Sequence, residues 1–295
     1  MKLDSLMFIV NPFSGTSSKK DFEKLILENL DKNRFDYVIR YTEAPQHAIT
    51  LAREAVAANY NFVVAVGGDG TVNEIASVLV NTNTVLGIIP GGSGNGLAMH
   101  LGIGRNQKKA IDIFNVNKAT DIDTCKVNEH FFINVSGIGF DARVTHSAKF
   151  ETKRGLSVYL KKTLSELRNY SPLEAKVEFP KLKKTVEGKY AIIEAANGPM
   201  YGYNFKICPP AVIDDGMMDV ILLRDSSIFK YLLNMPLVLS DNIHKSKLID
   251  HFRCDEMVVT IKNEDILHVD GESYPSELRH HYRIFPKSIK VVFPN

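Results

Sequence analysis

Four short apolar runs, each followed by a turn rich in glycine, proline or small polar residues, constrain the fold of this chain more than any other feature. The runs lie at residues 6–10, 37–41, 62–66 and 85–89, and patterns typical of helices of ten or more residues separate them. This alternation is typical of βαβ units and predicts a parallel sheet. We therefore expect an α/β domain in which all four turns lie at the carboxyl ends of strands, on one edge of the sheet.

The four turns carry the residue types that bind anions. They read NPFSG at 11–15, TEAP at 42–45, GGDGT at 67–71 and PGGSGN at 90–95. In open α/β sheets, ligands bind outside this edge, where helix N-termini present free N–H groups. Glycine lets the backbone approach an anion, and serine or threonine hydroxyls add donors. The turns predict a nucleotide phosphate site, although none of them contains G-x-x-x-x-G-K-[ST] or G-x-G-x-x-G.

An acid stands within the turn at 67–71. An anion beside a phosphate-receiving loop makes sense mainly if a cation accompanies the phosphate or if the acid orders the donors, and Asp69 is therefore a candidate for either role. Thr71 and Glu74 match the T-x-x-E capping box, so for both residues the alternative is simply to start the following helix.

From residue 121 onward, shorter β-rich runs separated by polar turns predict an antiparallel sandwich or barrel. Helical patterns interrupt them near 153–168 and, more weakly, at 227–246. We place the domain boundary near Ala119, giving domains 1–119 and 120–295, with a last strand at about 287–295 that could pack back on the first domain. NVSGIGFDA contains G-x-G-x-x-A, but a basic helical segment follows it, so we do not expect a dinucleotide site there.

Composition excludes several classes of protein. The 295 residues favour two domains, and 36 Lys and Arg against 34 Asp and Glu argue against a general nucleic-acid binder. Cys125, Cys208 and Cys254 lack the spacing of a disulfide framework or a zinc site, so we expect three buried thiols. We find neither a signal peptide nor a stretch long enough to span a membrane, so we expect a cytoplasmic protein.

Taken in order along nearly the whole chain, these motifs resemble the diacylglycerol kinase catalytic family, which includes bacterial diacylglycerol kinases and the sphingosine and ceramide kinases. NPFSG, GGDGTVNE and PGGSGN are similar to the family's nucleotide motifs. GIGFDA, PPAVIDDGMMDV and VDGE are similar to its second-domain motifs. The resemblance implies an ATP-binding α/β domain related to phosphofructokinase and NAD kinase, a β-sandwich domain, and an active site in the cleft between them.

The resemblance also implies roles for individual residues. Asp270 would be the general base, and Asp69 would belong to the network that holds nucleotide and Mg²⁺. Asp215 would hold a second, structural Mg²⁺ together with the carbonyls of Val212 and Met217. The residues implied to contact ATP are Asn11, Ser14, Gly15, Thr42, Gly67, Gly68, Asp69, Gly70, Thr71, Glu74 and Ser93.

Our interpretation is an ATP- and Mg²⁺-dependent lipid kinase that phosphorylates a lipid hydroxyl. Two alternatives stay open, an NAD-kinase-like enzyme acting on a soluble hydroxyl and a nucleotide-binding regulator without catalysis. Gly96 follows Asn95 where many bacterial members carry Asp, so diacylglycerol, a sphingoid base and related lipids all remain candidates. Also open are a homodimer and a transient, peripheral contact with the inner membrane face through a basic helix face formed by Arg154, Lys161 and Arg168.

Overall fold

The chain folds into two compact units. The computed structural model describes residues 3–14, 19–116, 118–149, 161–163, 165–167, 170–202 and 205–294. The first unit comprises Met1–Ile122 with Lys287–Asn295, and the second comprises Asp123–Pro286. Most of the helix predicted over 153–168, including Arg154 and Arg168, lies outside the described residues.

The first unit is an α/β domain with a parallel sheet, as predicted. Its strands are β1 (Asp4–Val10), β2 (Phe35–Tyr41), β3 (Phe62–Gly67) and β4 (Val85–Pro90). Its helices are α1 (Lys19–Asn29), α2 (His47–Ala57), α3 (Asp69–Leu79), α4 (Gly96–His100) and α5 (Gln107–Val116). The strand order is β2-β1-β3-β4, all parallel, and β4 also pairs in parallel with Val291 near the end of β17 (Arg279–Val292).

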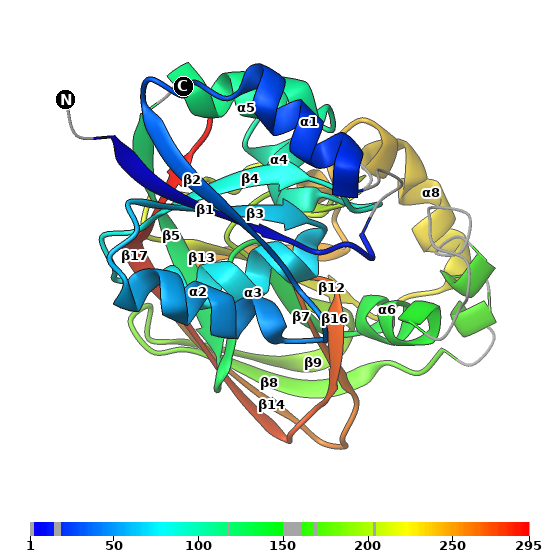
Figure 1. The fold of residues 1–295 in the computed structure, drawn as a ribbon. Helices are drawn as coiled ribbons and strands as arrows, with labels where there is room; N and C mark the ends of the chain where they lie inside the picture. The colour runs from blue at the N-terminus through cyan, green and yellow to red at the C-terminus, as the bar shows by residue number, and fades with distance from the viewer. Residues whose placement is uncertain are drawn as a thin grey trace. The chain divides into compact units, whose positions relative to one another are not determined.

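Helices cover both faces of this sheet, α2 and α3 on one face and α1 and α5 on the other (Figure 1). Strands β3 and β4 are therefore buried along their whole length, which explains why they read as unbroken apolar runs. On the α5 side, the rings of Phe35 and Phe114 stack with centroids 4.9 Å apart, and Phe62 meets Phe114 edge-on. Gly87 makes room for this packing, because a Cβ there would lie 3.0 Å from the Phe114 ring.

The strand order reverses between β1 and β3. From β1 the chain goes to β2 on one side, and then returns to β3 on the other side of β1. In open α/β sheets the carboxyl ends of two such strands form the crevice in which ligands bind. The fold thus selects the turns after β1 and β3 as the first place to look for a site.

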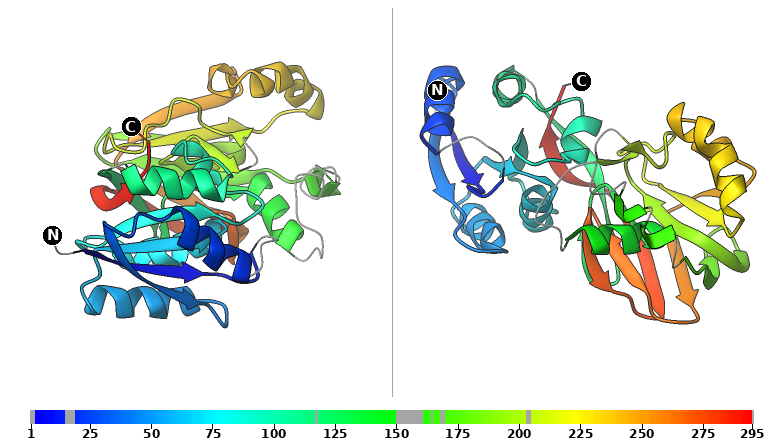
Figure 2. Two further views of the ribbon diagram at one scale, coloured as in Figure 1. Left: turned by 45° about the horizontal axis from the view of Figure 1, so that its top comes forward. Right: turned by 90° about the vertical axis from the view of Figure 1, so that its right-hand side faces the viewer.

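The second unit is an antiparallel β-sandwich, again as predicted (Figure 2). Its core includes Phe132, Phe179, Met257 and Tyr282, all less than 2 % exposed. Its helices include α6 (Phe140–Lys149), α8 (Ile228–Leu239) and the 3₁₀ turn η2 (Ile243–Lys245). Its strands, with β5 and β17 contributing to both units, are β5 (Ala119–Val127), β6 (His130–Phe132), β7 (Val135–Gly139), β8 (Leu173–Phe179), β9 (Lys184–Ala196), β10 (Met200–Gly202), β11 (Phe205–Lys206), β12 (Met218–Arg224), β13 (Ile249–Cys254), β14 (Glu256–Ile261), β15 (Ile266–Val269), β16 (Glu272–Pro275) and β17.

The G-x-G-x-x-A segment joins β7 to α6, but β7 pairs antiparallel with β9 and β15, so no βαβ unit forms there. Its glycines serve packing. A Cβ on Gly137 would lie 2.1 Å from Oε2 of Glu194, and at Gly139, which has φ +117, a Cβ would lie 2.5 Å from the carbonyl oxygen of Ala191. The three cysteines are buried and free, as predicted.

Candidate functional site

The turn after β1 is tied to the start of α3 at the switch point of the sheet. Asn11 donates its backbone N–H to the carbonyl of Val66 at 2.9 Å, and its side-chain amide donates to Oγ1 of Thr71 at 3.2 Å. Its side-chain oxygen accepts from the N–H of Phe13, and its carbonyl accepts from the hydroxyl of Ser14 at 2.9 Å. One asparagine therefore fixes the turn after β1 against the turn after β3.

The turns after β3 and β4 meet backbone to backbone. The N–H of Gly91 donates to the carbonyl of Gly67 at 2.7 Å. A Cβ on Gly92 would lie only 2.5 Å from the α-carbon of Gly68, so no side chain fits between the two turns. This close approach brings main-chain groups from two turns together at the edge where the sheet predicts an anion.

Asp69 is the first residue of α3, and Gly68 is the N-cap. A carboxylate in the first turn is favoured by the helix dipole. The Asp69 side chain also reaches the turn after β4, because a Cβ on Gly94 would lie 2.8 Å from its Oδ2. The acid therefore lies among the glycines of both turns.

The capping-box interpretation of Thr71 is wrong. Since α3 begins at Asp69, Thr71 lies inside the first helical turn and its Oγ1 accepts from Asn11. Glu74 accepts instead from the backbone N–H of Gln46, at the start of α2, at 3.3 Å. Both side chains therefore link α3 to neighbouring turns.

The other predicted ATP contacts are dispersed along the same edge. Thr42 is buried and donates its N–H to the carbonyl of Val10 at 2.9 Å, Ser93 is exposed, and Gly15 lies outside the described residues. The predicted ATP contacts did not include Asn95, the last residue of the PGGSGN turn, whose side-chain oxygen accepts from the N–H of Gly92 at 2.9 Å and whose amide donates to the Gly92 carbonyl at 2.6 Å. Its φ is +52, a left-handed conformation that asparagine tolerates better than most residues. The signal available in the sequence was an asparagine that ends a glycine-rich turn.

In the second unit, Asp270 and Gly271 form the two-residue turn between β15 and β16, with φ of +46 and +88 and with Val269 paired to Glu272. Positive φ at both positions is the hairpin geometry that Asp-Gly favours. The Asp270 carboxylate accepts three backbone hydrogen bonds, from Ile133 at 2.8 Å, Asn134 at 3.0 Å and Val135 at 2.9 Å. The proposed base therefore also organises the chain that leads into β7.

Asp215 has partners from the protein itself. One carboxylate oxygen accepts from the N–H of Met217 at 3.0 Å, and the other pairs with the guanidinium of Arg253. The magnesium site implied for Asp215, Val212 and Met217 stays a prediction, in which the ion would share the Asp215 carboxylate with Arg253 or replace it.

A buried cluster that the sequence analysis did not identify centres on His268 of β15, the strand that leads to Asp270. Nε2 of His268 is 3.0 Å from a carboxylate oxygen of Asp141 and 3.0 Å from one of Glu194. Burial raises the pKa of Glu194 to about 8. Burial alone would lower the pKa of His268, but the two carboxylates outweigh it and raise this pKa to about 10.

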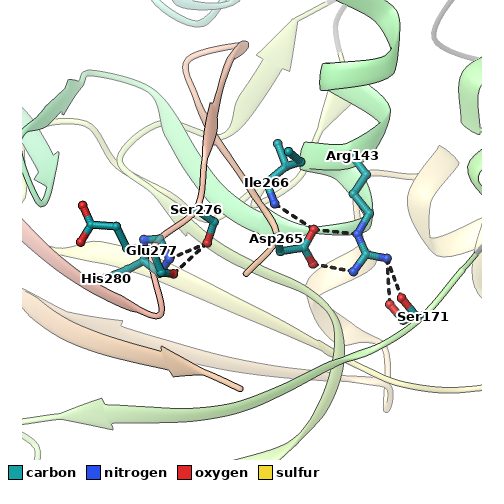
Figure 3. A network of polar contacts seen from close by, with 7 residues as sticks. All are labelled: Arg143, Ser171, Asp265, Ile266, Ser276, Glu277 and His280. Carbon is teal, nitrogen blue, oxygen red and sulfur yellow. Dashed lines mark hydrogen bonds and ion pairs between the residues drawn. The ribbon is translucent and has the colours of Figure 1, made fainter. Parts of the chain in front are cut away.

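One further ion pair and several hydrogen bonds join separate segments of the second unit. Figure 3 shows Arg143 of α6 forming a two-pronged pair with Asp265, just before β15, and donating to Ser171. In the same view Ser276 contacts His280, with Oγ 2.8 Å from Nε2. These contacts anchor α6 and the ends of the β15–β16 hairpin.

Two family models cover the chain. Residues 5–127 match the diacylglycerol kinase catalytic domain, and residues 134–293 match the YegS C-terminal NAD kinase beta sandwich-like domain. The chain therefore belongs to the family of lipid kinases that carry these two domains, as its motifs predict.

Individual relatives agree with this assignment. The chain is 31% identical over 90% of its length to a Streptococcus pneumoniae protein named "Putative lipid kinase", covering 90% of that protein. It is 27% identical over 97% of its length to a Bacillus subtilis diacylglycerol kinase, covering 95% of it. A crystal structure of a diacylglycerol kinase from Bacillus anthracis, 18% identical, shares the fold with a TM-score of 0.74 over 100% of this chain and 98% of that chain. Among the described residues, no helix is both long and apolar enough to cross a membrane.

Proposed function

We propose that this protein transfers the γ-phosphate of ATP to a lipid hydroxyl. The observation that carries the proposal is the contact between Asn11 and Thr71, which joins the turns after β1 and β3 at the switch point of the sheet. Phosphoryl transfer needs mainly positioned donors and charge stabilisation, and clustered glycine turns beside a helix N-terminus provide such donors. Membership of the lipid kinase family supports the same reaction.

The proposal gives each unit a separate task. In the first unit the backbone of 67–71 and 91–95, with Asn11 and Thr71, binds the nucleotide phosphates. Asp69 is the residue that would hold Mg²⁺, which supplies positive charge to the phosphates when bound. In the second unit the carboxylate of Asp270 receives the proton of the acceptor hydroxyl.

The acceptor is proposed to be a lipid alcohol, with diacylglycerol the first to test because the Bacillus subtilis relative carries that name. The decisive experiment incubates the purified chain with labelled ATP and a panel of diacylglycerol, sphingoid bases and other lipid alcohols in mixed micelles. Phosphorylation of one class identifies the substrate. Labelling of NAD or another soluble alcohol, with no labelled lipid, would overturn the proposal.

The same assay tests the nucleotide site. We expect Asp69→Ala to abolish turnover and the rise of the melting temperature with Mg-ATP, since it removes the acid that lies among both glycine turns. Asp112→Ala is the matched control, because this acid of α5 is half exposed and pairs only with Lys108 among the described residues. Normal turnover of Asp69→Ala would show that the acid serves only to start α3.

A further inference from the structure

Helix α8 presents an apolar face to solvent. Five of its large apolar side chains are exposed, namely Ile228 at 49%, Phe229 at 68%, Leu232 at 61%, Leu233 at 62% and Met235 at 42%. Their spacing of three and four residues places them on neighbouring positions of one side of the helix. Single exposed apolar side chains are common, but a contiguous group of this kind marks an interaction surface.

Two polar residues of α8, Tyr231 and Asn234, face the protein. The hydroxyl of Tyr231 donates to the carbonyl of Arg224 at 3.1 Å and accepts from the N–H of Ser226 at 2.9 Å. The side-chain oxygen of Asn234 accepts from the hydroxyl of Ser246 at 2.6 Å. These bonds fix the rotation of the helix about its axis, so the outward direction of the apolar face is built into the fold.

Both views in Figure 2 show α8, drawn in yellow, along the outer side of the strands of the second unit. A hollow of about 480 Å³ runs beside the helix, lined by Lys230, Lys245 and Lys247 together with apolar side chains that include Leu233. Among the described residues, no carboxylate forms an ion pair with these three lysines. Asp241, the acid of the segment that follows, pairs with Lys206 at 2.7 Å. The apolar face is therefore bordered by positive charge.

We propose that α8 docks this protein on the surface of an anionic lipid bilayer, with the apolar face in the interface and the three lysines on lipid phosphates. Apolar area beside basic residues is the combination that binds such surfaces. A second copy of the chain fits less well, because a two-fold interface would bring the same lysines of both copies together. The inference rests on the proposed function in one respect only: docking explains how an enzyme whose acceptor is a lipid reaches that lipid.

Co-sedimentation of the full chain with vesicles tests the proposal without measuring catalysis. Vesicles of phosphatidylcholine are compared with vesicles that also contain phosphatidylglycerol, at low and high salt. We expect binding that increases with phosphatidylglycerol, falls with salt, and weakens at least about tenfold in a Phe229→Glu, Leu233→Glu double variant. Replacing Lys245 and Lys247 by Gln should remove most of the dependence on phosphatidylglycerol.

Leu182→Glu is the matched control. Leu182 is 48% exposed in the turn between β8 and β9, where Lys181 and Lys183 flank it. This turn therefore combines an exposed apolar side chain with lysines, as α8 does, but without a helix. We expect its binding to equal that of the parent. The proposal is overturned if the parent does not bind, if the α8 variant binds as well as the parent, or if that variant only converts a dimer into monomers.

An activity measurement separates this inference from the proposed function. With a short-chain lipid alcohol that is dissolved as monomers, the Phe229→Glu, Leu233→Glu variant should phosphorylate as fast as the parent, whereas its rate on vesicle-bound substrate should fall. Equal loss on both substrates would overturn docking. Vesicle binding that depends on α8, with no lipid phosphorylated by the parent, would leave docking standing and contradict the proposed kinase activity.

Discussion

The contact between two glycine turns makes a steric prediction for the nucleotide site. In Gly92→Ala, the new Cβ would lie 2.5 Å from the α-carbon of Gly68, whereas ordinary contacts of this kind begin at 3.4 Å. The turns after β3 and β4 must therefore separate by about 0.9 Å, the difference between these two distances. A movement of that size also stretches the 2.7 Å hydrogen bond from Gly91 to Gly67 beyond its usual range.

The separation should affect binding more than folding. Overpacking of this kind costs about 1–3 kcal/mol of the free energy of unfolding, which a chain of this size can tolerate. A displacement of about 1 Å among positioning groups can reduce a rate about 10²-fold. We therefore expect Gly92→Ala to fold, to bind Mg-ATP weakly and to lose about 10²-fold in kcat/KM.

Three measurements check this prediction: urea unfolding, titration with Mg-ATP, and initial rates on the best lipid. Gly68→Ala is a graded companion, because its Cβ would lie 3.2 Å from the α-carbon of Gly92 and should cause a smaller loss. Gly188→Ala in β9 is the control, since its nearest neighbour is the end of the Tyr190 ring at 3.4 Å. Unchanged affinity for Mg-ATP in Gly92→Ala would refute the assignment of these turns to phosphate binding.

Three further predictions concern the second unit. Asp270→Asn places an amide NH₂ against at least one of the N–H groups of 133–135, so urea denaturation should show a free energy of unfolding lower by about 1–3 kcal/mol. An unchanged midpoint would show that the Asp270 carboxylate does not hold this segment. Without nucleotide, Mg²⁺ should raise the melting temperature of Arg253→Gln, which frees Asp215, more than that of the parent; an equal effect on both proteins would contradict a magnesium site at Asp215. Because folding raises the pKa of Glu194 to about 8 and that of His268 to about 10, the folded state holds extra protons, so stability should fall with rising pH, between about 5 and 8 for Glu194 and between about 7 and 10 for His268. Urea unfolding of Glu194→Gln should show a flatter dependence between pH 5 and 8, and a slope equal to that of the parent would contradict the assignment.

The sequence predicts the first unit well because the signals there are local. Each buried strand is an apolar run, and each is ended by its own turn residues, so alternation alone gives the parallel sheet and the edge at which the turns gather. The start of α3 was less predictable, since Gly68, Asp69 and Thr71 can each begin a helix. Tertiary contacts decide it, because Asn11 occupies the hydroxyl that a threonine N-cap would use.

The second unit shows why the remaining features could not be predicted. The apolar pattern of α8 indicates an amphipathic helix, and an amphipathic helix is normally expected to bury its apolar side. Which side faces the protein depends on Tyr231 and Asn234 finding partners at Arg224 and Ser246. No periodicity encodes those partners, and hydrogen bonds to fixed groups outside the helix can set its rotation even when apolar area stays in water. The direction of the face, and with it the inference of a membrane surface, follows only once these contacts are known.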